Sequence, residues 1–328
     1  MRKLTVALVV LFLFAGSALA AYPEKNIQGY IMWGAGGAMD NVARAITPMA
    51  QEHLGKTIIM QNKTGATGAI ATTFVANQPA DGYTLLFGAE NPNLYKVTGL
   101  SQIDYDQFDP VFLMMGNVGV VVVPKDSPFK SYKDLIEAAA SGKTVTVGST
   151  GPGGLPYVAT TMIEKIHGVK FNKVQFDGEG PCLTALMGGH IDAVAVGLLA
   201  AASHIKAGSV NGLAMISKER IPGLDSVPAV TEIYEQYAPY LPWGAFFGVF
   251  VKKGTPKEAY DALQAAYQKA YEDPKFDEFA KNMGGVKLGL TGDEAREFIK
   301  QNQSVSAWLL YDAGGAKFSP EEFGIKRP

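Results

Sequence analysis

Short apolar runs alternate along the chain with longer segments of helical periodicity, and glycine-rich turns separate them. The first apolar run, residues 27–32, predicts a strand. Residues 38–54 predict a helix that ends at Gly55, with an apolar side at Val42, Ala45, Ile46, Met49 and Leu54. Pro48 lies inside this segment and is expected to kink the helix or divide it.

The same alternation continues to about residue 88. A strand over residues 57–61 leads through a second glycine turn into a helix that ends near Asn77. Asp81-Gly82 then turns the chain into an apolar strand, residues 83–88. This strand–helix–strand–helix–strand order predicts a parallel sheet with helices on both faces.

A second unit of the same kind begins near residue 118. Its first helix runs to Ala140 and opens with Ser131-x-x-Asp134, the sequence of a capping box. Further elements follow at similar spacing: strands over 118–123, 145–148, 171–176, 191–196 and 213–216, and a helix to about His167. The last third predicts a strand over 246–251, a helix from Thr255-Pro256 to Tyr271, and a helix that Thr291-x-x-Glu294 caps and that ends near Asp312.

Two such units predict an α/β protein with two lobes around a cleft, joined by two crossover strands near residues 118–124 and 225–250. The expected first lobe comprises residues 21–123 plus 225–328, because the final third returns to pack on the first unit. The expected second lobe comprises residues 124–224. The chain length of 328 residues suits two domains of ordinary size.

The N-terminus predicts export. Arg2 and Lys3 precede an apolar run over residues 4–15, and Ala18-x-Ala20 follows as a cleavage site. Residues 1–20 are therefore expected to be a secretory signal peptide that is cleaved after Ala20. A transmembrane anchor is the alternative, but the apolar run is too short to span a bilayer comfortably.

Charge and cysteine content exclude several classes of partner and cofactor. The formal charge of the whole chain is −2, and loss of Arg2 and Lys3 makes it more negative, which argues against a nucleic-acid partner. The single cysteine, Cys182, excludes an internal disulfide and a Cys-x-x-Cys site, and we expect it to be inert. The four histidines show no metal-ligand spacing, so neither a metal nor a cofactor is predicted.

The glycine turn at residues 34–40 is the candidate binding element. It fits a dinucleotide fingerprint, a phosphate loop, a carboxylate cradle or a purely structural tight turn. Gly34-Ala35-Gly36-Gly37 matches the start of the fingerprint, but Met39 stands where the third glycine is expected. The Lys-Ser/Thr ending of a phosphate loop is also missing.

Repetition favours a binding role. Gly65-Ala66-Thr67-Gly68 is a second glycine turn between a strand and a helix, and Gly151-Pro152-Gly153-Gly154 is a third in the other unit. Ligands of parallel α/β sheets lie beyond the carboxyl ends of the strands, where these turns are expected. Three such turns can surround a small anion with backbone N–H donors at helix N-termini.

Several single residues leave alternatives open. Asp40 either forms an ion pair with Arg44, four residues later on the helix, or accepts hydrogen bonds that join the two first-lobe glycine turns. Lys63 either supplements the anion site or is a solvated loop lysine. Gly-x-Ser-x-Gly, His-Glu-x-x-His and Ser-x-x-Lys are absent from the sequence, so we expect a binding protein; a cleft enzyme remains the rival interpretation.

The chain resembles the TctC/Bug family, the periplasmic receptors of tripartite tricarboxylate transporters. The resemblance extends over essentially the whole mature chain, and its most specific segment is Pro79-Ala80-Asp81-Gly82-Tyr83-Thr84-Leu85-Leu86. Other matching motifs are Tyr22-Pro23-Glu24-Lys25, the glycine turn with Asp40 and Ala43-Arg44, Asn62-Lys63-Thr64-Gly65-Ala66, Gly148-Ser149, Leu183-Thr184-Ala185-Leu186 and Val251-Lys252-Lys253-Gly254-Thr255-Pro256.

This resemblance implies a type II periplasmic binding fold and a monomeric receptor that holds a small organic carboxylate. It implies delivery of that ligand to the membrane subunits of a tripartite tricarboxylate transporter; a sensor for a membrane kinase is the alternative. Amides of the two first-lobe turns are expected to hold the carboxylate, with contributions from two second-lobe turns. The resulting candidate ligand-binding residues are Trp33, Gly34, Ala35, Gly36, Gly37, Ala38, Asp40, Gly65, Ala66, Thr67, Gly68, Ser149, Thr150, Gly151, Gly153, Gly154, Phe176, Asp177, Gly178, Glu179 and Gly180.

The turn at residues 176–180 departs from the family pattern. Members commonly have an aromatic residue followed by Lys-Gly there, whereas this chain has Phe176-Asp177-Gly178-Glu179-Gly180. Two carboxylates at the cleft would repel a polyanion. We therefore expect a monocarboxylate, or a ligand whose far end is neutral or cationic, provided that these side chains do not both face bulk water.

Overall fold

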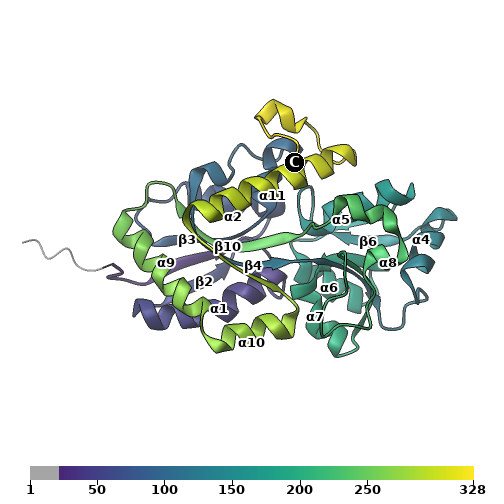
Figure 1. The fold of residues 1–328 in the computed structure, drawn as a ribbon, viewed down its shortest axis with the longest axis horizontal. Helices are drawn as coiled ribbons and strands as arrows, with labels where there is room; N and C mark the ends of the chain where they lie inside the picture. The colour runs from purple at the N-terminus through teal and green to yellow at the C-terminus, as the bar shows by residue number, and fades with distance from the viewer. Residues whose placement is uncertain (1–21) are drawn as a thin grey trace, which may run out of the picture.

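The computed structural model describes residues 22–328, and the predicted signal peptide lies outside this range. The chain forms two α/β lobes that lie side by side, each built on one sheet with helices on both faces (Figure 1). This arrangement confirms the predicted fold class.

The first lobe contains a six-stranded mixed sheet in the order β11-β4-β10-β3-β1-β2. Strands β1, β2 and β3 are parallel, as predicted, whereas β10 lies antiparallel between β3 and β4, and β11 is antiparallel to β4. The strands are β1 (Ile27–Ile31), β2 (Ile58–Asn62), β3 (Thr84–Ala89), β4 (Phe108–Asn117), β10 (Ala245–Lys252) and β11 (Val286–Leu290). Five of the six residues of β3 are buried, which explains its continuous apolar run.

Helices cover both faces of this sheet, with α1, α9 and α10 on one side and α2 and α11 on the other (Figure 1). They are α1 (Ala38–Leu54), α2 (Ala69–Ala76), α3 (Tyr95–Thr98), α9 (Lys257–Tyr271), α10 (Pro274–Met283) and α11 (Gly292–Asp312). Helix α1 has the predicted bounds and ends at Gly55 in the left-handed conformation. The Thr291 side chain makes no capping hydrogen bond to α11, so that part of the predicted cap is wrong.

Helix α1 is continuous through Pro48, so of the two expected outcomes, a kink or a division, the division does not occur. Proline removes one helical N–H, the donor that would otherwise reach the carbonyl of Arg44. Both Pro48 and Arg44 lie on the exposed side of α1, where water can hydrogen-bond to the freed carbonyl. The buried side of the helix keeps its packing against the sheet.

The second lobe contains a five-stranded sheet in the order β7-β6-β8-β5-β9. Helix α5 lies on one face, and α6 and α7 lie on the other (Figure 1). Its strands are β5 (Gly119–Pro124), β6 (Thr146–Ser149), β7 (Asn172–Gln175), β8 (Ala193–Gly197) and β9 (Val210–Ile216). Its helices are α4 (Tyr132–Ala140), α5 (Leu155–His167), α6 (Glu179–Met187), α7 (Leu198–Lys206) and α8 (Val230–Ile233). The Ser131–Asp134 capping box at the start of α4 is present as predicted.

Five short 3₁₀ segments complete the secondary structure described for residues 22–328. They are η1 (Ala66–Gly68), η2 (Asn91–Leu94), η3 (Tyr105–Gln107), η4 (Glu235–Tyr240) and η5 (Pro320–Phe323). Segment η1 belongs to the second glycine turn, and η2 follows the carboxyl end of β3. In the same range, no helix combines the length and apolar character needed to cross a bilayer.

The sheets divide the chain at slightly different points from those predicted. Strand β5 pairs with β8 and β9, so the second sheet begins at Gly119 rather than after residue 123. Residues 225–244 also pack on the second lobe: the Tyr237 hydroxyl lies 2.6 Å from that of Tyr132 on α4. We therefore propose lobes of residues 22–117 plus 245–328 and of residues 118–244. The apolar run over 118–123 identified a strand but could not show which sheet it joins.

Candidate functional site

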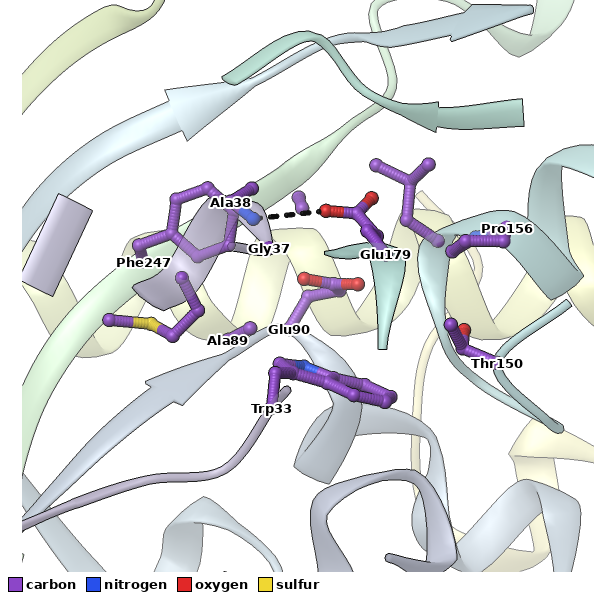
Figure 2. Close-up of a pocket in the computed structure, with 12 residues that line it drawn as sticks. Trp33, Gly37, Ala38, Ala89, Glu90, Thr150, Pro156, Glu179 and Phe247 are labelled. Atoms are coloured by element: carbon purple, nitrogen blue, oxygen red, sulfur yellow. Dashed lines mark hydrogen bonds between the residues drawn. The ribbon is translucent and has the colours of Figure 1, made fainter. Parts of the chain in front are cut away.

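An inner pocket lies between the two lobes, at the carboxyl ends of β1 and β3 and the N-termini of α1 and α5. Its free space is about 20 Å³, enough for about one water molecule. Figure 2 shows the carboxyl groups of Glu90 and Glu179 facing this space, with Trp33 along one side and Phe247 along another. The residues that line it are Trp33, Gly37, Ala38, Met39, Ala89, Glu90, Thr150, Leu155, Pro156, Glu179, Ala245 and Phe247.

The first glycine turn carries the chain from β1 into α1 and forms one wall of the inner pocket. Gly36 has a φ of +76°, which a residue with a side chain rarely adopts. The Gly36 N–H donates to the Asp40 carboxylate at 3.0 Å, and the Gly34 N–H donates to the Asp177 carbonyl at 3.1 Å. Protein acceptors therefore occupy two of the amides that the sequence assigned to a ligand.

Asp40 forms the ion pair with Arg44 and accepts a hydrogen bond from the first glycine turn, but within residues 22–328 it makes none to the second glycine turn. Its carboxylate accepts hydrogen bonds from Arg44 Nε at 2.8 Å, from Gly36 N–H, and from Asn62 Nδ2 at 2.9 Å. Asn62 ends β2 and also donates to the Trp33 carbonyl at 2.8 Å. Asp40 thus holds the first turn against the end of β2. It supports the wall of the inner pocket without lining the pocket itself.

Glu179 crosses from the second lobe to the N-terminus of α1. Its Oε2 accepts the Ala38 N–H at 3.3 Å, shown dashed in Figure 2, and its Oε1 accepts the Gly197 N–H. The first-turn N–H groups of a helix carry partial positive charge, so a carboxylate is stabilised there. Loss of solvation nevertheless raises the Glu179 pKa, and the two backbone hydrogen bonds oppose that rise.

Glu90 follows β3 and points into the inner pocket from the first lobe. Its residue exposure is 5%, and burial raises its pKa to about 8; the negative charge of Glu179 adds to that rise. Its Oε1 accepts from Asn91 Nδ2 at 3.3 Å, whereas Oε2 has no hydrogen-bond partner within residues 22–328. The backbone N–H of Leu155, at the start of α5, faces this carboxyl group and lowers its pKa slightly.

The two acids therefore stand at helix N-termini of the opposite lobes. Glu179 of the second lobe meets α1, and Glu90 of the first lobe faces α5. Thr150 supplies one more unsatisfied group: its buried Oγ1 lines the pocket and has no partner in the described part of the chain. Buried polar atoms normally have hydrogen-bond partners, so this arrangement favours a polar occupant.

An outer groove lies beside the inner pocket and shares Trp33 and Thr150 as walls. Its free space is about 520 Å³. It is lined by the second glycine turn of the first lobe and by two second-lobe turns: Trp33, Gly65, Ala66, Thr67, Leu100, Thr150, Gly151, Pro152, Gln175, Phe176, Asp177 and Pro181.

The second glycine turn holds four consecutive residues at positive φ. Gly65 and Gly68 have φ values of 114° and 85°, while Ala66 and Thr67 have 48° and 52°. This conformation costs a residue with a side chain about 1–2 kcal/mol, and such strain is concentrated at ligand-binding and catalytic sites. The Tyr95 hydroxyl donates to the Thr67 carbonyl at 2.9 Å and helps to hold the strained turn.

Direct hydrogen bonds join the lobes around both cavities. Thr67 Oγ1 donates to the Thr150 carbonyl at 3.2 Å, and Asn91 Nδ2 donates to the Gly153 carbonyl at 2.8 Å. Gly180 comes so close that a Cβ atom there would lie 2.1 Å from the Ala35 carbonyl oxygen. Glycine at this position permits the close backbone approach between the lobes.

The structure brings the four predicted turns together between the lobes, but only part of the candidate set lines a cavity. The cavity-lining candidates are Trp33, Gly37, Ala38, Gly65, Ala66, Thr67, Thr150, Gly151, Phe176, Asp177 and Glu179. The remaining candidates line neither space in residues 22–328 and form turns or contacts between the lobes: Gly34, Ala35, Gly36, Asp40, Gly68, Ser149, Gly153, Gly154, Gly178 and Gly180.

The turn at residues 176–180, which differs from the family pattern, contains two acids in different environments. Asp177 is exposed at the outer groove and contributes its backbone carbonyl to the lobe contact. Glu179 faces the inner pocket rather than bulk water. The predicted repulsion of a polyanion therefore rests on Glu179 alone. Lys63 lies 4.4 Å from the centre of the Phe74 ring and lines neither cavity. Cys182 is buried with a raised pKa, as expected for an inert thiol.

Sequence reasoning missed Glu90 and Phe247, together with the apolar pocket residues Met39, Ala89, Leu155, Pro156 and Ala245. Glu90 had a usable signal, because it directly follows an apolar parallel strand and so lies at the ligand-binding edge of the sheet. Phe247 had none, because it belongs to β10, which joins this sheet from the far end of the chain. Within residues 22–328, no three His, Cys, Asp or Glu side chains are grouped as metal ligands.

Comparisons with known proteins converge on one family. Residues 42–310 match the family model described as the tripartite tricarboxylate transporter family receptor. The chain is 27% identical over 301 residues to BugT of Bordetella pertussis, covering 89% of this chain and 90% of BugT. The periplasmic binding protein BugD superposes with a TM-score of 0.83 at 29% identity, covering 90% and 99% of the two chains. MatC from Rhodopseudomonas palustris, solved with bound malate, gives a TM-score of 0.82 at 25% identity over 88% of this chain and all of MatC.

Proposed function

Because the chain belongs to the family of tripartite tricarboxylate transporter receptors, we propose that it is an exported receptor for a small organic carboxylate. Members of this family are solute-binding proteins rather than enzymes. We propose that the ligand binds in the cleft between the lobes and is delivered to the membrane subunits of such a transporter. The receptor acts in the periplasm as a monomer after cleavage behind Ala20.

The strained turn at residues 65–68 supports this proposal most directly. Three of its four positive-φ residues, Gly65, Ala66 and Thr67, line the outer groove, and the second-lobe turn at Thr150 and Gly151 faces them. Main-chain N–H groups at such turns bind a carboxylate without a basic side chain. We assign the ligand carboxylate to this groove, because protein acceptors already occupy the amides of Gly34, Gly36 and Ala38.

Closure of the two lobes around the ligand distinguishes the loaded receptor from the empty one. Contacts across the cleft, such as that from Thr67 to Thr150, exist only when the lobes approach. A ligand that touches both lobes shifts the population toward this closed arrangement in proportion to its differential affinity. The two adjacent crossover strands, which meet near Asn117 and Gly244, are the expected hinge.

Isothermal titration calorimetry of the purified mature protein with a panel of small organic acids tests the proposal. We expect at least one carboxylate to bind, and Gly65→Ala to weaken that binding at least tenfold. Gly55→Ala is the control: it also places a side chain at positive φ, at the end of α1, where an added Cβ meets open space. Binding of a sugar together with indifference to every carboxylate would refute the proposal.

A further inference from the structure

We propose that the ligand also carries a positively charged nitrogen, which lies in the inner pocket between Glu90 and Glu179. This inference rests on the proposed function and narrows its substrate class to zwitterions with a primary ammonium group, such as amino acids, in place of dicarboxylates and tricarboxylates. The nitrogen end enters the inner pocket, and the carboxylate end remains in the outer groove.

The charge of the inner pocket carries the argument. Two of the twelve residues that line it are acids, and none is lysine, arginine or histidine. The Oε2 of Glu90 is buried without a hydrogen-bond partner in residues 22–328 and faces the pocket, so its lone pairs are available for a donor. Burial favours the protonated form of this carboxyl group while the pocket holds no cation, and an ammonium group beside Oε2 would stabilise the ionised form.

The size and shape of the pocket also suit a protonated nitrogen. The free space of about 20 Å³ accommodates one group of about the size of water, and an ammonium group is of that size. Glu90 Oε2 and Thr150 Oγ1 are two unsatisfied acceptors for its three N–H donors, and the Glu179 carboxylate is a third acceptor on the pocket wall. Trp33 and Phe247 add aromatic rings that favour a cation over an anion (Figure 2).

A second carboxylate in the same place would meet opposite conditions. It would lie beside Glu179, whose carboxylate already occupies the Ala38 N–H at the positive end of α1. It would also face Glu90, which is itself buried and close enough for the charge of Glu179 to raise its pKa. Repulsion between like charges is strong where water is largely excluded, so a polyanion is disfavoured.

The position of the two cavities sets the polarity of the ligand. Trp33 and Thr150 line both spaces, so the two cavities are adjacent, and a ligand that occupies both must pass between these two residues. The N–H donors of the strained turn lie on the outer side, where Asp177 is exposed to solvent, and the two facing acids, Glu90 and Glu179, lie on the inner side. A zwitterion matches both ends at once.

The test compares amino acids with the acids of the same carbon skeleton that lack the nitrogen, by calorimetry on the full mature protein. Pairs such as glutamate with glutarate and 4-aminobutyrate with butyrate are titrated, together with a trimethylated betaine as a control that is expected not to bind, because its nitrogen is too large for the inner pocket and carries no N–H. We expect at least one zwitterion to bind at least tenfold more tightly than its nitrogen-free partner. If nitrogen-free acids bind and no zwitterion is preferred, the inference fails while the proposed function stands; if no carboxylate of either kind binds, both fail.

Isosteric variants then locate the interaction. Glu90→Gln and Glu179→Gln are expected to reduce the preference for the zwitterion at least tenfold, measured as the ratio of the affinities of the zwitterion and of its nitrogen-free partner for the same variant. Glu164→Gln is the matched control, because Glu164 is equally buried but pairs with Lys173 in the second lobe, away from both cavities. An unchanged preference in both pocket variants would overturn the assignment. The comparison of ligands on the unmodified protein decides the matter if a variant does not fold.

Discussion

The inner pocket and the outer groove are adjacent parts of one cleft, but they differ in size and in the kind of residues that line them. The inner pocket is closely packed, with side chains from β1, β3, β10 and the starts of α1, α5 and α6, and it contains two acids. The outer groove has about 520 Å³ of free space against about 20 Å³, and four of the residues that line it, Gly65, Ala66, Thr67 and Gly151, have positive φ. The contrast implies that side chains set the charge preference at the inner end and that backbone geometry sets binding at the outer end.

Glycine also has a different role in the outer groove than near the inner pocket. In the outer groove, Gly65 and Gly68 permit positive φ and so shape the binding turn. Near the inner pocket, Gly180 lacks a side chain because the Ala35 carbonyl of the other lobe occupies that space. Glycine-rich turns in this protein therefore serve backbone conformation in one place and lobe contact in the other.

Gly180→Ala should have the largest effect, because it disturbs both ends together. Its Cβ would lie 2.1 Å from the Ala35 carbonyl oxygen, so the lobes could not close as they do here. We expect ligand affinity to fall about a thousandfold, or about 4 kcal/mol, with little change in thermal stability. Gly116→Ala is the control, since its added Cβ meets neighbours only at ordinary contact distances of 3.7 Å or more. Unchanged affinity in Gly180→Ala would show that closure is not needed for binding.

Titration of Glu90 isolates the inner pocket. Its pKa is about 8 in the native protein against an ordinary value of 4.5, so the native state holds the proton more firmly than the unfolded state. The resulting stabilisation is fully present below about pH 4.5 and is lost as the pH rises to about 8, by roughly 4–5 kcal/mol. The groups that face Glu90 are Glu179, the Leu155 N–H, and the Tyr95 and Tyr105 rings, whose high pKa values keep them neutral in this range.

Urea unfolding at pH 5 and pH 8 measures this effect in the unmodified protein and in Glu90→Gln. We expect the difference in unfolding free energy between the two pH values to shift by roughly 3 kcal/mol in the variant, because glutamine does not titrate. Equal pH dependence in both proteins would mean that Glu90 is already ionised at neutral pH. The inner pocket would then be more polar than the structure indicates.

Asp40→Ala tests the wall that the inner pocket shares with the first glycine turn. The substitution leaves the Gly36 N–H, Arg44 and Asn62 without their shared acceptor. We expect a loss of about 2 kcal/mol of unfolding free energy, because buried donors lose their partner. Asp261→Ala is the comparison: it removes an exposed ion pair with Lys257 and should cost under about 0.5 kcal/mol. Similar losses in the two variants would argue that Asp40 is merely a surface partner of Arg44.

Ala66→Gly should have the smallest effect and concerns the outer groove alone. Ala66 has a φ of 48°, so glycine relieves strain, and we expect a gain of about 0.5–1 kcal/mol in unfolding free energy. Ala138→Gly within α4 should have the opposite sign, with a loss of about 1 kcal/mol. A destabilised Ala66→Gly would contradict the interpretation that the turn is strained.

Local sequence patterns predicted much of the fold because local interactions determine many of its elements. The helical spacing of apolar residues and the stop at Gly55 placed α1 at its observed bounds. Strand β4 was missed, because Pro110 interrupts its apolar pattern and a proline normally argues against a central strand. In the structure Pro110 lies next to an irregular pairing of β4 with β10, which accommodates the missing N–H.

The candidate site was predictable only as far as turns and strand ends reveal it. Glycine spacing located the four turns, and the structure brings them together. Sequence could not show that Glu179 reaches Ala38, 141 positions earlier, or that Glu90 lies opposite it. These contacts depend on how the two lobes approach each other, which no local pattern encodes.

The split of the first sheet between the two ends of the chain has a consequence for biosynthesis. Strand β4 pairs only with β10 and β11, which are made more than a hundred residues later, whereas all five strands of the inserted lobe are made in between. During translation and export, the apolar edges of β3 and β4 therefore remain unpaired until β10 has been synthesised. A chain truncated anywhere before Ala245 would expose these edges permanently, and unpaired edges of this kind promote aggregation.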